Sequence, residues 1–308
     1  MEYVLKTDNL CKNYRRVQVL KNLNMNIPKG SIYGFVGRNG AGKTTLIRLI
    51  CGLQKPTSGS FDLLGVNSQN TKELSTARER IGAIIENPAI YKNMTAVDNL
   101  KMQYLNLGLP DYEGIDELLE LVGLSDTGKK HAGHFSLGMR QRLAIAIALC
   151  GNPDFIILDE PVNGLDPEGI IEIRELILKL NHEKGITILI SSHILDELSR
   201  IATHYGFIDN GCIVREMSAE ELEKECSKCI RIKISDSEIF ARTMDEQHIE
   251  YKMIDDSTAD VFSDVTISKL AITLANAGCE LIKAEEKDES LESFYLSLLG
   301  GENNAENA

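Results

Sequence analysis

The sequence has no uncharged apolar run of the ~20 residues that a membrane-spanning helix needs. Its longest candidates, such as residues 143–150, stop far short of that length. The first six residues also lack the basic segment and apolar core of a secretory signal peptide. The seven cysteines are an odd number scattered through apolar segments, which fits a reducing compartment better than a disulfide framework. We therefore expect a cytoplasmic protein that does not cross a membrane.

The sequence also lacks an excess of positive charge. Its formal net charge is −13, and residues 225–308 hold 18 acidic against 8 basic side chains. A nucleic-acid backbone or an anionic lipid surface attracts basic proteins, so this end of the chain is poorly suited to either. We expect no nucleic-acid partner, and we interpret the acidic charge as a contribution to solubility.

What the sequence does contain is a complete phosphate-binding loop. It matches the pattern GxxxxGK[ST] at every fixed position, with an apolar strand predicted at 32–36 before it and a helix at 45–50 after it. Successive backbone N–H groups in such a loop point at a polyphosphate. Lys43 is expected to reach the β- and γ-phosphates, and the Thr44 hydroxyl to hold Mg²⁺. The predicted ATP-binding residues of the loop are Gly37, Arg38, Asn39, Gly40, Ala41, Gly42, Lys43, Thr44 and Thr45.

The surrounding pattern predicts an α/β fold with a mixed sheet. Continuous apolar runs at 155–158 and 187–190, separated by a helix at 168–181, indicate parallel strands buried on both faces. Alternating segments at 3–6 and 17–20 predict an antiparallel edge, and 88–152 has the spacing of a helical insertion. Ligands of such sheets collect at the carboxyl ends of the strands.

A second, smaller α+β domain is predicted after the first one. We place the boundary at 222/223, with an accessory domain at 223–299 and a disordered tail at 300–308. The element order βαββαβ suggests a split βαβ, ferredoxin-like arrangement that an amphipathic helix at 291–299 closes. The predicted elements are strands at 230–234, 249–253, 260–262 and 281–282 and helices at 238–247 and 268–277.

Polar side chains at two predicted strand ends carry the expected chemistry. Asp159 and Glu160 follow the strand at 155–158, where Asp159 would hold Mg²⁺ and Glu160 would polarise the attacking water. His193 ends the strand at 187–190, where an imidazole could orient that water. Each has a plainer reading, since two carboxylates can simply solvate a strand end and a lone histidine is commonly structural. Ser136 is likewise a natural helix N-cap as well as a candidate anion contact.

In this order the motifs resemble those of ABC transporter ATP-binding subunits, over roughly the first 220 residues. Residues 37–45 look like the Walker A loop, 155–160 like Walker B, 163–166 like the D-loop and 135–139 like the signature. The resemblance implies that Tyr14 stacks on adenine, that His193 contacts the γ-phosphate, and that two ATPase subunits close head to tail over two ATP molecules. Ser136, Gly138 and Asp166 would then complete the partner's nucleotide site.

Two departures from the family pattern make the chain resemble one subgroup of the family. Leu137 and Met139 replace a glycine and a glutamine of the signature, and Glu86 stands where the family usually has a glutamine that contacts nucleotide and Mg²⁺. Both departures resemble the subgroup that exports bacitracin-like and lantibiotic peptides. By that resemblance, the chain is an ATP-hydrolysing motor of an exporter on the inner face of the membrane. It would pair as a homodimer and dock on separate permease subunits through a groove at 86–91.

Two other functions fit parts of the pattern. One is a soluble ABC ATPase that acts on ribosomes or DNA, although such proteins usually carry two ATPase units or long coiled-coil inserts. The other is a nucleotide-binding regulator with little turnover, which the altered signature would suggest.

Overall fold

The computed structural model describes residues 2–86, 88–109, 111–226, 229–262 and 265–287, together with residues 294, 295 and 298. The chain divides into two compact units, Met1–Ala219 and Glu220–Ala308, which we describe separately. The predicted closing helix at 291–299 and the predicted tail at 300–308 lie outside the described residues, except for those three positions.

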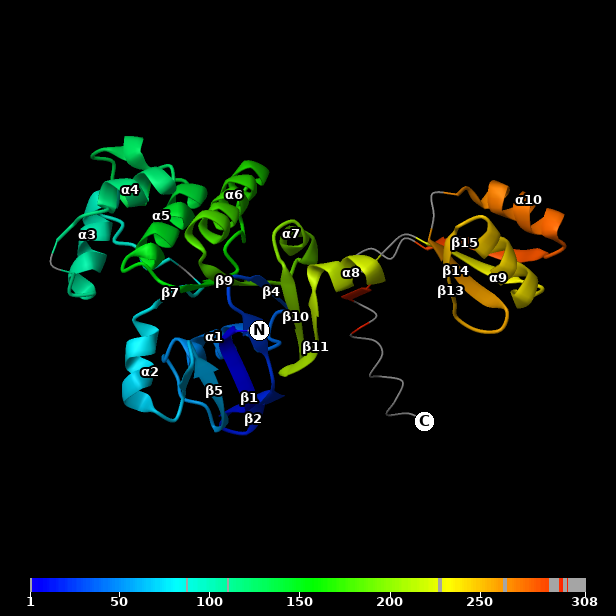
Figure 1. The fold of residues 1–308 in the computed structure, drawn as a ribbon. Helices are drawn as coiled ribbons and strands as arrows, with labels where there is room; N and C mark the ends of the chain where they lie inside the picture. Colours follow the sequence, from blue (N-terminus) through cyan, green and yellow to red (C-terminus); the bar gives the residue numbers. More distant parts are fainter. Residues whose placement is uncertain are drawn as a thin grey trace. The chain divides into compact units, whose positions relative to one another are not determined.

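The centre of the first unit is a six-stranded sheet in the order β11-β10-β4-β9-β8-β7 (Figure 1). All neighbouring strands are parallel except β10 and β11, which form a hairpin. The three central strands are buried along their whole length, as their apolar runs predict. The strands are β4 (Ile32–Val36), β7 (Ile81–Ile84), β8 (Phe155–Asp159), β9 (Thr187–Ser192), β10 (His204–Asp209) and β11 (Cys212–Ser218).

A second sheet in this unit is antiparallel, in the order β2-β1-β5-β6, with β3 paired to β1. The sequence suggested only an antiparallel edge, whereas these strands form a sheet of their own. The reason is helix α1 (Lys43–Ile50), whose apolar side chains are fully buried in one core with residues of both sheets. The strands are β1 (Tyr3–Tyr14), β2 (Val17–Leu23), β3 (Asn26–Pro28), β5 (Ser58–Leu63) and β6 (Val66–Asn67).

Helices cover the parallel sheet on both sides. In Figure 1, α1 and the antiparallel strands lie on one side, and α3 to α6 lie on the other. The predicted helical insertion is present as α3, α4 and α5 with two short 3-10 turns between α4 and α5. The helices are α2 (Thr71–Arg78), α3 (Ala96–Asn106), α4 (Ile115–Leu121), α5 (Leu137–Leu149), α6 (Pro167–Lys184) and α7 (Leu195–Ser199). Within the described part of the chain, none of the helices has the length and apolarity to span a bilayer.

After α8 (Ala219–Glu225), the second unit has the split βαβ topology, with four antiparallel strands in the order β13-β14-β12-β15. Alternate residues of β12 (Ile230, Ile232 and Ile234) are buried in its own core with Phe240 and Leu270 of the two helices. The elements are β12 (Cys229–Ile234), α9 (Ser237–Glu246), β13 (Glu250–Met253), β14 (Thr258–Phe262), α10 (Ile267–Ala277) and β15 (Leu281–Lys287).

Candidate functional site

The phosphate-binding loop joins β4 to α1 at the carboxyl end of the parallel sheet. Gly40 and Gly42 have φ angles of 83° and 115°, which side chains other than glycine rarely adopt. At Gly37 a Cβ atom would lie 2.5 Å from Ile208 Cγ2 and 2.7 Å from Ile208 O. Helix α1 begins at Lys43, two residues before the predicted start, because Gly42 is its N-cap. These glycines therefore let the loop curl tightly in front of the helix N-terminus.

The ammonium group of Lys43 is held inside this loop. Its side chain is 6% exposed, and Nζ donates to the carbonyl oxygen of Gly37 at 2.6 Å. The same Nζ lies 3.2 Å from Glu160 Oε1. The cation expected to bind phosphate is thus paired with the predicted catalytic carboxylate.

The two predicted Mg²⁺ contacts at the strand end lie together. Thr44 Oγ1 donates to Asp159 Oδ2 at 2.8 Å, and Asp159 is buried at the end of β8. A carboxylate and a hydroxyl oxygen are the hard donors that Mg²⁺ prefers in proteins, so this pair suits that ion. The other carboxylate oxygen of Asp159 accepts from the hydroxyl of Ser191 on β9. Sequence reasoning did not single out Ser191, although it lies in the strand that precedes His193.

His193 lies against the predicted catalytic carboxylate. Its Nδ1 is 2.7 Å from Glu160 Oε2, while Lys43 contacts the other oxygen of that carboxylate. Glu160 has a φ of 51°, in the left-handed region, directly after β8. The three predicted catalytic residues therefore meet at one carboxylate, which could accept a proton from a water molecule.

A further carboxylate stands beside this group. Burial raises the pKa of Glu197, His193 partly opposes that rise, and Glu160 adds to it. Glu197 belongs to α7, whereas His193 lies before that helix, so helical spacing in the sequence could not have pointed to Glu197.

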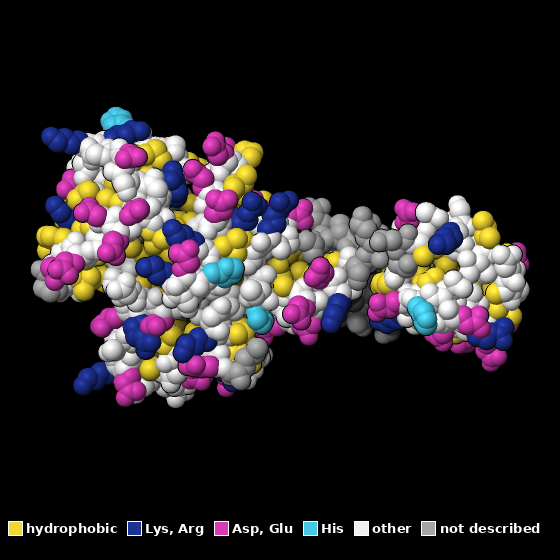
Figure 2. Space-filling view, turned by 45° about the horizontal axis from the view of Figure 1, so that its top comes forward, with side chains coloured by type: hydrophobic (Ala, Val, Ile, Leu, Met, Phe, Trp, Pro, Cys, Tyr) yellow, Lys and Arg dark blue, Asp and Glu magenta, His cyan; other side chains and the backbone are white. Residues whose placement is uncertain are grey.

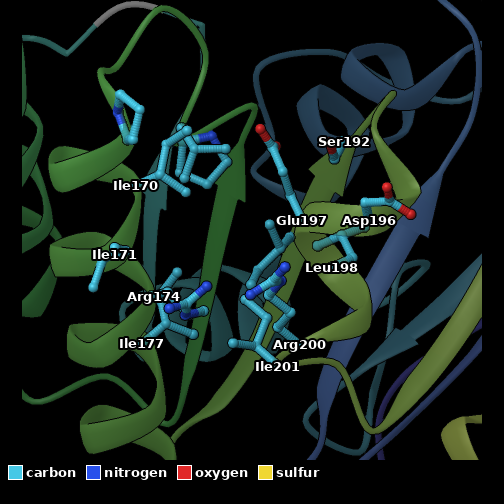
Figure 3. Close-up of a pocket in the computed structure, with 14 residues that line it drawn as sticks. Ile170, Ile171, Arg174, Ile177, Ser192, Asp196, Glu197, Leu198, Arg200 and Ile201 are labelled. Carbon is cyan, nitrogen blue, oxygen red and sulfur yellow. The ribbon is translucent and has the colours of Figure 1, made fainter.

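An apolar pocket of about 310 Å³ lies next to these segments, between α6 and α7 (Figure 3). Ile170 and Ile177 come from α6, and Asp196 and Glu197 come from α7. Its wall includes Ser192, the residue before His193. Helix α6, which follows the D-loop, and helix α7, which follows His193, thus face each other across this pocket.

The signature and D-loop residues begin two helices that share a second cavity. Ser136 caps α5 by accepting from Met139 N at 3.1 Å, and Asp166 caps α6 by accepting from Gly169 N at 3.1 Å. The capping role considered for Ser136 is therefore present. Both residues, with Gly138, line a cavity of about 470 Å³ whose lining residues all lie between 136 and 172. Leu137 lies at its wall and is 39% exposed.

The two remaining predicted residues lie at the protein surface. Tyr14 is 39% exposed at the β1–β2 turn; its hydroxyl contacts Gln54, and Lys12 Nζ lies 5.2 Å from its ring centroid. Glu86 is more than half exposed and pairs with Arg48 of α1 at 2.7 Å. To bind nucleotide or Mg²⁺, the Glu86 carboxylate would therefore have to leave Arg48.

Comparisons with known proteins find relatives of one family. The ABC transporter family model matches residues 20–163. The bacitracin transport ATP-binding protein BcrA of Bacillus licheniformis is 42% identical over 306 residues, which cover 98% of this chain and 99% of that protein. The lantibiotic transport ATP-binding protein SrtF of Streptococcus pyogenes is 46% identical over 224 residues, 72% of this chain and 95% of that one.

Solved structures give the same result for the fold. CbiO1 of Clostridium perfringens, part of the ABC transporter complex CbiONQ, has a TM-score of 0.67 and 30% identity, covering 73% of this chain and 92% of that one. A dimeric ATP-binding cassette bound to ADP and Pi has a TM-score of 0.63 and 28% identity, covering 70% and 98%. The predicted fold class and the resemblance are thus confirmed. The chain belongs to the ABC transporter family, as one of its ATP-binding, ATP-hydrolysing subunits.

Proposed function

We propose that this subunit drives the export of peptide antibiotics through separate permease subunits and so protects the cell that makes it. The similarity to a bacitracin transport protein over 98% of this chain carries the proposal, because it includes the accessory unit as well as the ATPase unit. The second supporting relative is a lantibiotic transport protein, so both relatives are named for transport of peptide antibiotics.

ATP would bind across the loop at 37–45, with Tyr14 against the adenine ring. Lys43 would leave Glu160 for the phosphates, because a polyphosphate carries more negative charge than one carboxylate. Thr44 and Asp159, with Glu86 as a third candidate, would hold Mg²⁺, which supplies charge neutralisation at the phosphates.

Glu160 would act as the proton acceptor for the attacking water. The carboxylate already lies 2.7 Å from His193 Nδ1, so the imidazole can hold it in place once Lys43 has moved to phosphate. Because an ionised carboxylate can only accept, His193 would donate from Nδ1 to Glu160. Its Nε2 can donate to the γ-phosphate as well when the imidazole carries both protons.

Two copies of the chain would form the complete enzyme on the inner face of the membrane. Ser136, Gly138 and Asp166 lie around one cavity, and we propose that they contact the nucleotide held by the other subunit. The permease subunits would dock at 86–91. A change at the nucleotide could reach that segment through the Arg48–Glu86 ion pair, because Arg48 belongs to the helix that follows the phosphate loop.

The test is ATP turnover by the chain co-expressed and reconstituted with candidate permease subunits, in the presence of bacitracin or a lantibiotic. Stimulation by the peptide, lost in Glu160→Gln, supports the proposal. ATP turnover that changes with neither the permease subunits nor the peptides contradicts the proposal. Salt-sensitive binding to ribosomes or DNA would instead favour a soluble ABC ATPase that acts on them. On the face in Figure 2, Lys and Arg are interspersed with Asp and Glu, so this face offers no continuous basic surface among the described residues.

A further inference from the structure

Ser191 lies at the centre of the parallel sheet, where three strands end. It is fully buried on β9, and its register partners are Asp159 on β8 and Phe35 on β4. The next residue, Ser192, hydrogen-bonds through its own hydroxyl with the backbone of Ile194. Successive side chains of a strand point to opposite faces, so only one of the two serines faces the carboxylates.

The Ser191 hydroxyl connects the two predicted working carboxylates. It donates its hydrogen to Asp159 Oδ1, and its oxygen accepts from the backbone N–H of Glu160 at 3.0 Å. A hydroxyl has one hydrogen to donate, and an ionised carboxylate can only accept, so the direction of the first bond is fixed.

For Asp159, this contact sets the orientation of the carboxylate. One oxygen is taken by Ser191, which turns the other toward Thr44 Oγ1 at 2.8 Å. Without the hydroxyl, the buried carboxylate would keep its hydrogen bond from Thr44 and could rotate about its last side-chain bond. The oxygen intended for Mg²⁺ would then lose its fixed direction.

For Glu160, the same hydroxyl helps to hold an unfavourable backbone conformation. Its φ of 51° lies in the left-handed region, which is unfavourable for a residue with a Cβ atom. The Glu160 N–H is bound by both the carbonyl oxygen of Ser191, at 3.2 Å, and the hydroxyl, at 3.0 Å. This conformation is the one in which the side chain reaches Lys43 and His193.

We propose that Ser191 is a positioning residue of the ATPase site, which fixes the Mg²⁺-holding Asp159 and the water-activating Glu160 relative to each other. The inference rests on the proposed roles of those two residues. Removal of a hydrogen-bond partner behind a metal ligand typically costs about 10- to 100-fold in metal affinity or activity. We expect Ser191→Ala to raise the Mg²⁺ concentration for half-maximal effect by about 10-fold or more.

The experiment measures equilibrium binding of ATP to the full chain, first with EDTA and then across a Mg²⁺ titration. In EDTA, Ser191→Ala should bind ATP as the wild type does, because the phosphate loop and Lys43 are unchanged. In the titration, it should need a higher Mg²⁺ concentration to reach the affinity for ATP that Mg²⁺ gives the wild type. The matched control is Thr187→Val, which deletes another buried hydroxyl at the opposite end of β9, where it accepts from Gly30 N at 2.9 Å. This control should lose stability without a change in Mg²⁺ dependence.

A Ser191→Ala protein with the Mg²⁺ dependence of the wild type, or a control that shifts equally, overturns the inference. Should Ser191→Ala not fold, Ser191→Cys keeps the size of the side chain with much weaker hydrogen bonding, and its Mg²⁺ dependence decides the question in the same way. Asp159→Asn separates the two levels. If Asp159→Asn leaves the Mg²⁺ dependence of ATP binding unchanged, the proposed metal-holding role of Asp159 fails. If Asp159→Asn removes that dependence, the role of Asp159 stands and the Ser191 variants test the positioning role alone.

Discussion

Replacement of Glu160 by glutamine is expected to stop ATP hydrolysis and, at the same time, to tighten the binding of ATP. Glutamine keeps the size of the side chain but cannot accept a proton from water at neutral pH. A positioned general base contributes about 10²- to 10⁴-fold to a rate, so the loss of turnover should be of that order. The tighter binding follows from the ion pair between Glu160 and Lys43, which Lys43 would leave when it binds phosphate.

The size of this second effect follows from the geometry of the pair. Opposite unit charges 3.2 Å apart attract by about 5 kcal/mol at an effective dielectric constant of ~20. Glu160 is 22% exposed, so solvent screens part of that attraction, and glutamine keeps a polar contact with the lysine. We therefore take about 1–3 kcal/mol as the destabilisation of the nucleotide-free protein, in which a nearly buried Lys43 loses its anion.

ATP restores a negative charge beside Lys43, so the complex escapes most of this penalty. By a thermodynamic cycle, the variant should bind ATP more tightly by the same about 1–3 kcal/mol, or about 5- to 150-fold in Kd. The assay combines calorimetric unfolding without nucleotide with equilibrium ATP binding in EDTA, where hydrolysis does not interfere. Asp154→Asn serves as a control, since it removes a carboxylate from an exposed pair with Arg80 near the start of the same strand.

Unchanged unfolding and unchanged ATP affinity in Glu160→Gln would refute the reasoning, even if hydrolysis were lost. Such a result would mean that the carbonyl oxygens of Gly37 and Arg38 hold Lys43 in place without Glu160. Lower stability without tighter binding would instead mean that Lys43 does not move to the phosphates.

Three further substitutions test other parts of the site. Tyr14→Ala should raise the Kd for ATP by roughly 5- to 150-fold, as loss of about 1–3 kcal/mol of base stacking implies, while Tyr14→Phe should bind ATP normally. Gly164→Ala, at a φ of 77°, should lower the free energy of unfolding by about 1 kcal/mol and slow ATP turnover. Gly185→Ala, at a φ of 67°, should lower the free energy of unfolding without slowing turnover. Urea unfolding measures the first effect and phosphate release the second. Burial raises the pKa of Glu197 in the folded protein, so its ionisation opposes folding as pH rises through that pKa. Glu197→Gln should therefore stabilise the protein at pH 7, and urea unfolding below about pH 4, where both states are protonated, should show no such gain.

The local part of the site could be predicted from sequence because its geometry is local. A glycine-rich loop between a strand and a helix has little freedom, so Lys43 and Thr44 lie at the helix start as expected. Asp159 and His193 follow from the rule that parallel strands end at one edge of a sheet. The structure brings Thr44, Asp159, Glu160 and His193 together through hydrogen bonds that no spacing in the sequence specifies.

The remainder depends on contacts between segments far apart in the chain. Glu86 pairs with Arg48 and adopts a left-handed conformation after β7, and neither feature is indicated by its position in the sequence. The antiparallel sheet was expected at an edge, because short alternating segments do not reveal that both sheets cover α1. Strand β1 is also much longer than its predicted segment. Asp8 and Asn9 are both exposed, and register shifts between Asp8 and Asn13 break the alternation that a strand prediction uses.

The separation of the two clusters supports the proposal that one chain gives only half of each ATPase site. Lys43, Asp159, Glu160 and His193 are joined by contacts at one end of the sheet, while the signature cavity is lined by residues of 136–142 and 164–172. Leu137, at the position of a family glycine, places a 39% exposed side chain on that cavity wall. Closure of a dimer over this wall would bury that apolar surface, which favours association by about 25 cal/mol per Å². A leucine that limits the approach of the backbone to phosphate would thus also strengthen the closed dimer, and the altered signature is compatible with an active ATPase.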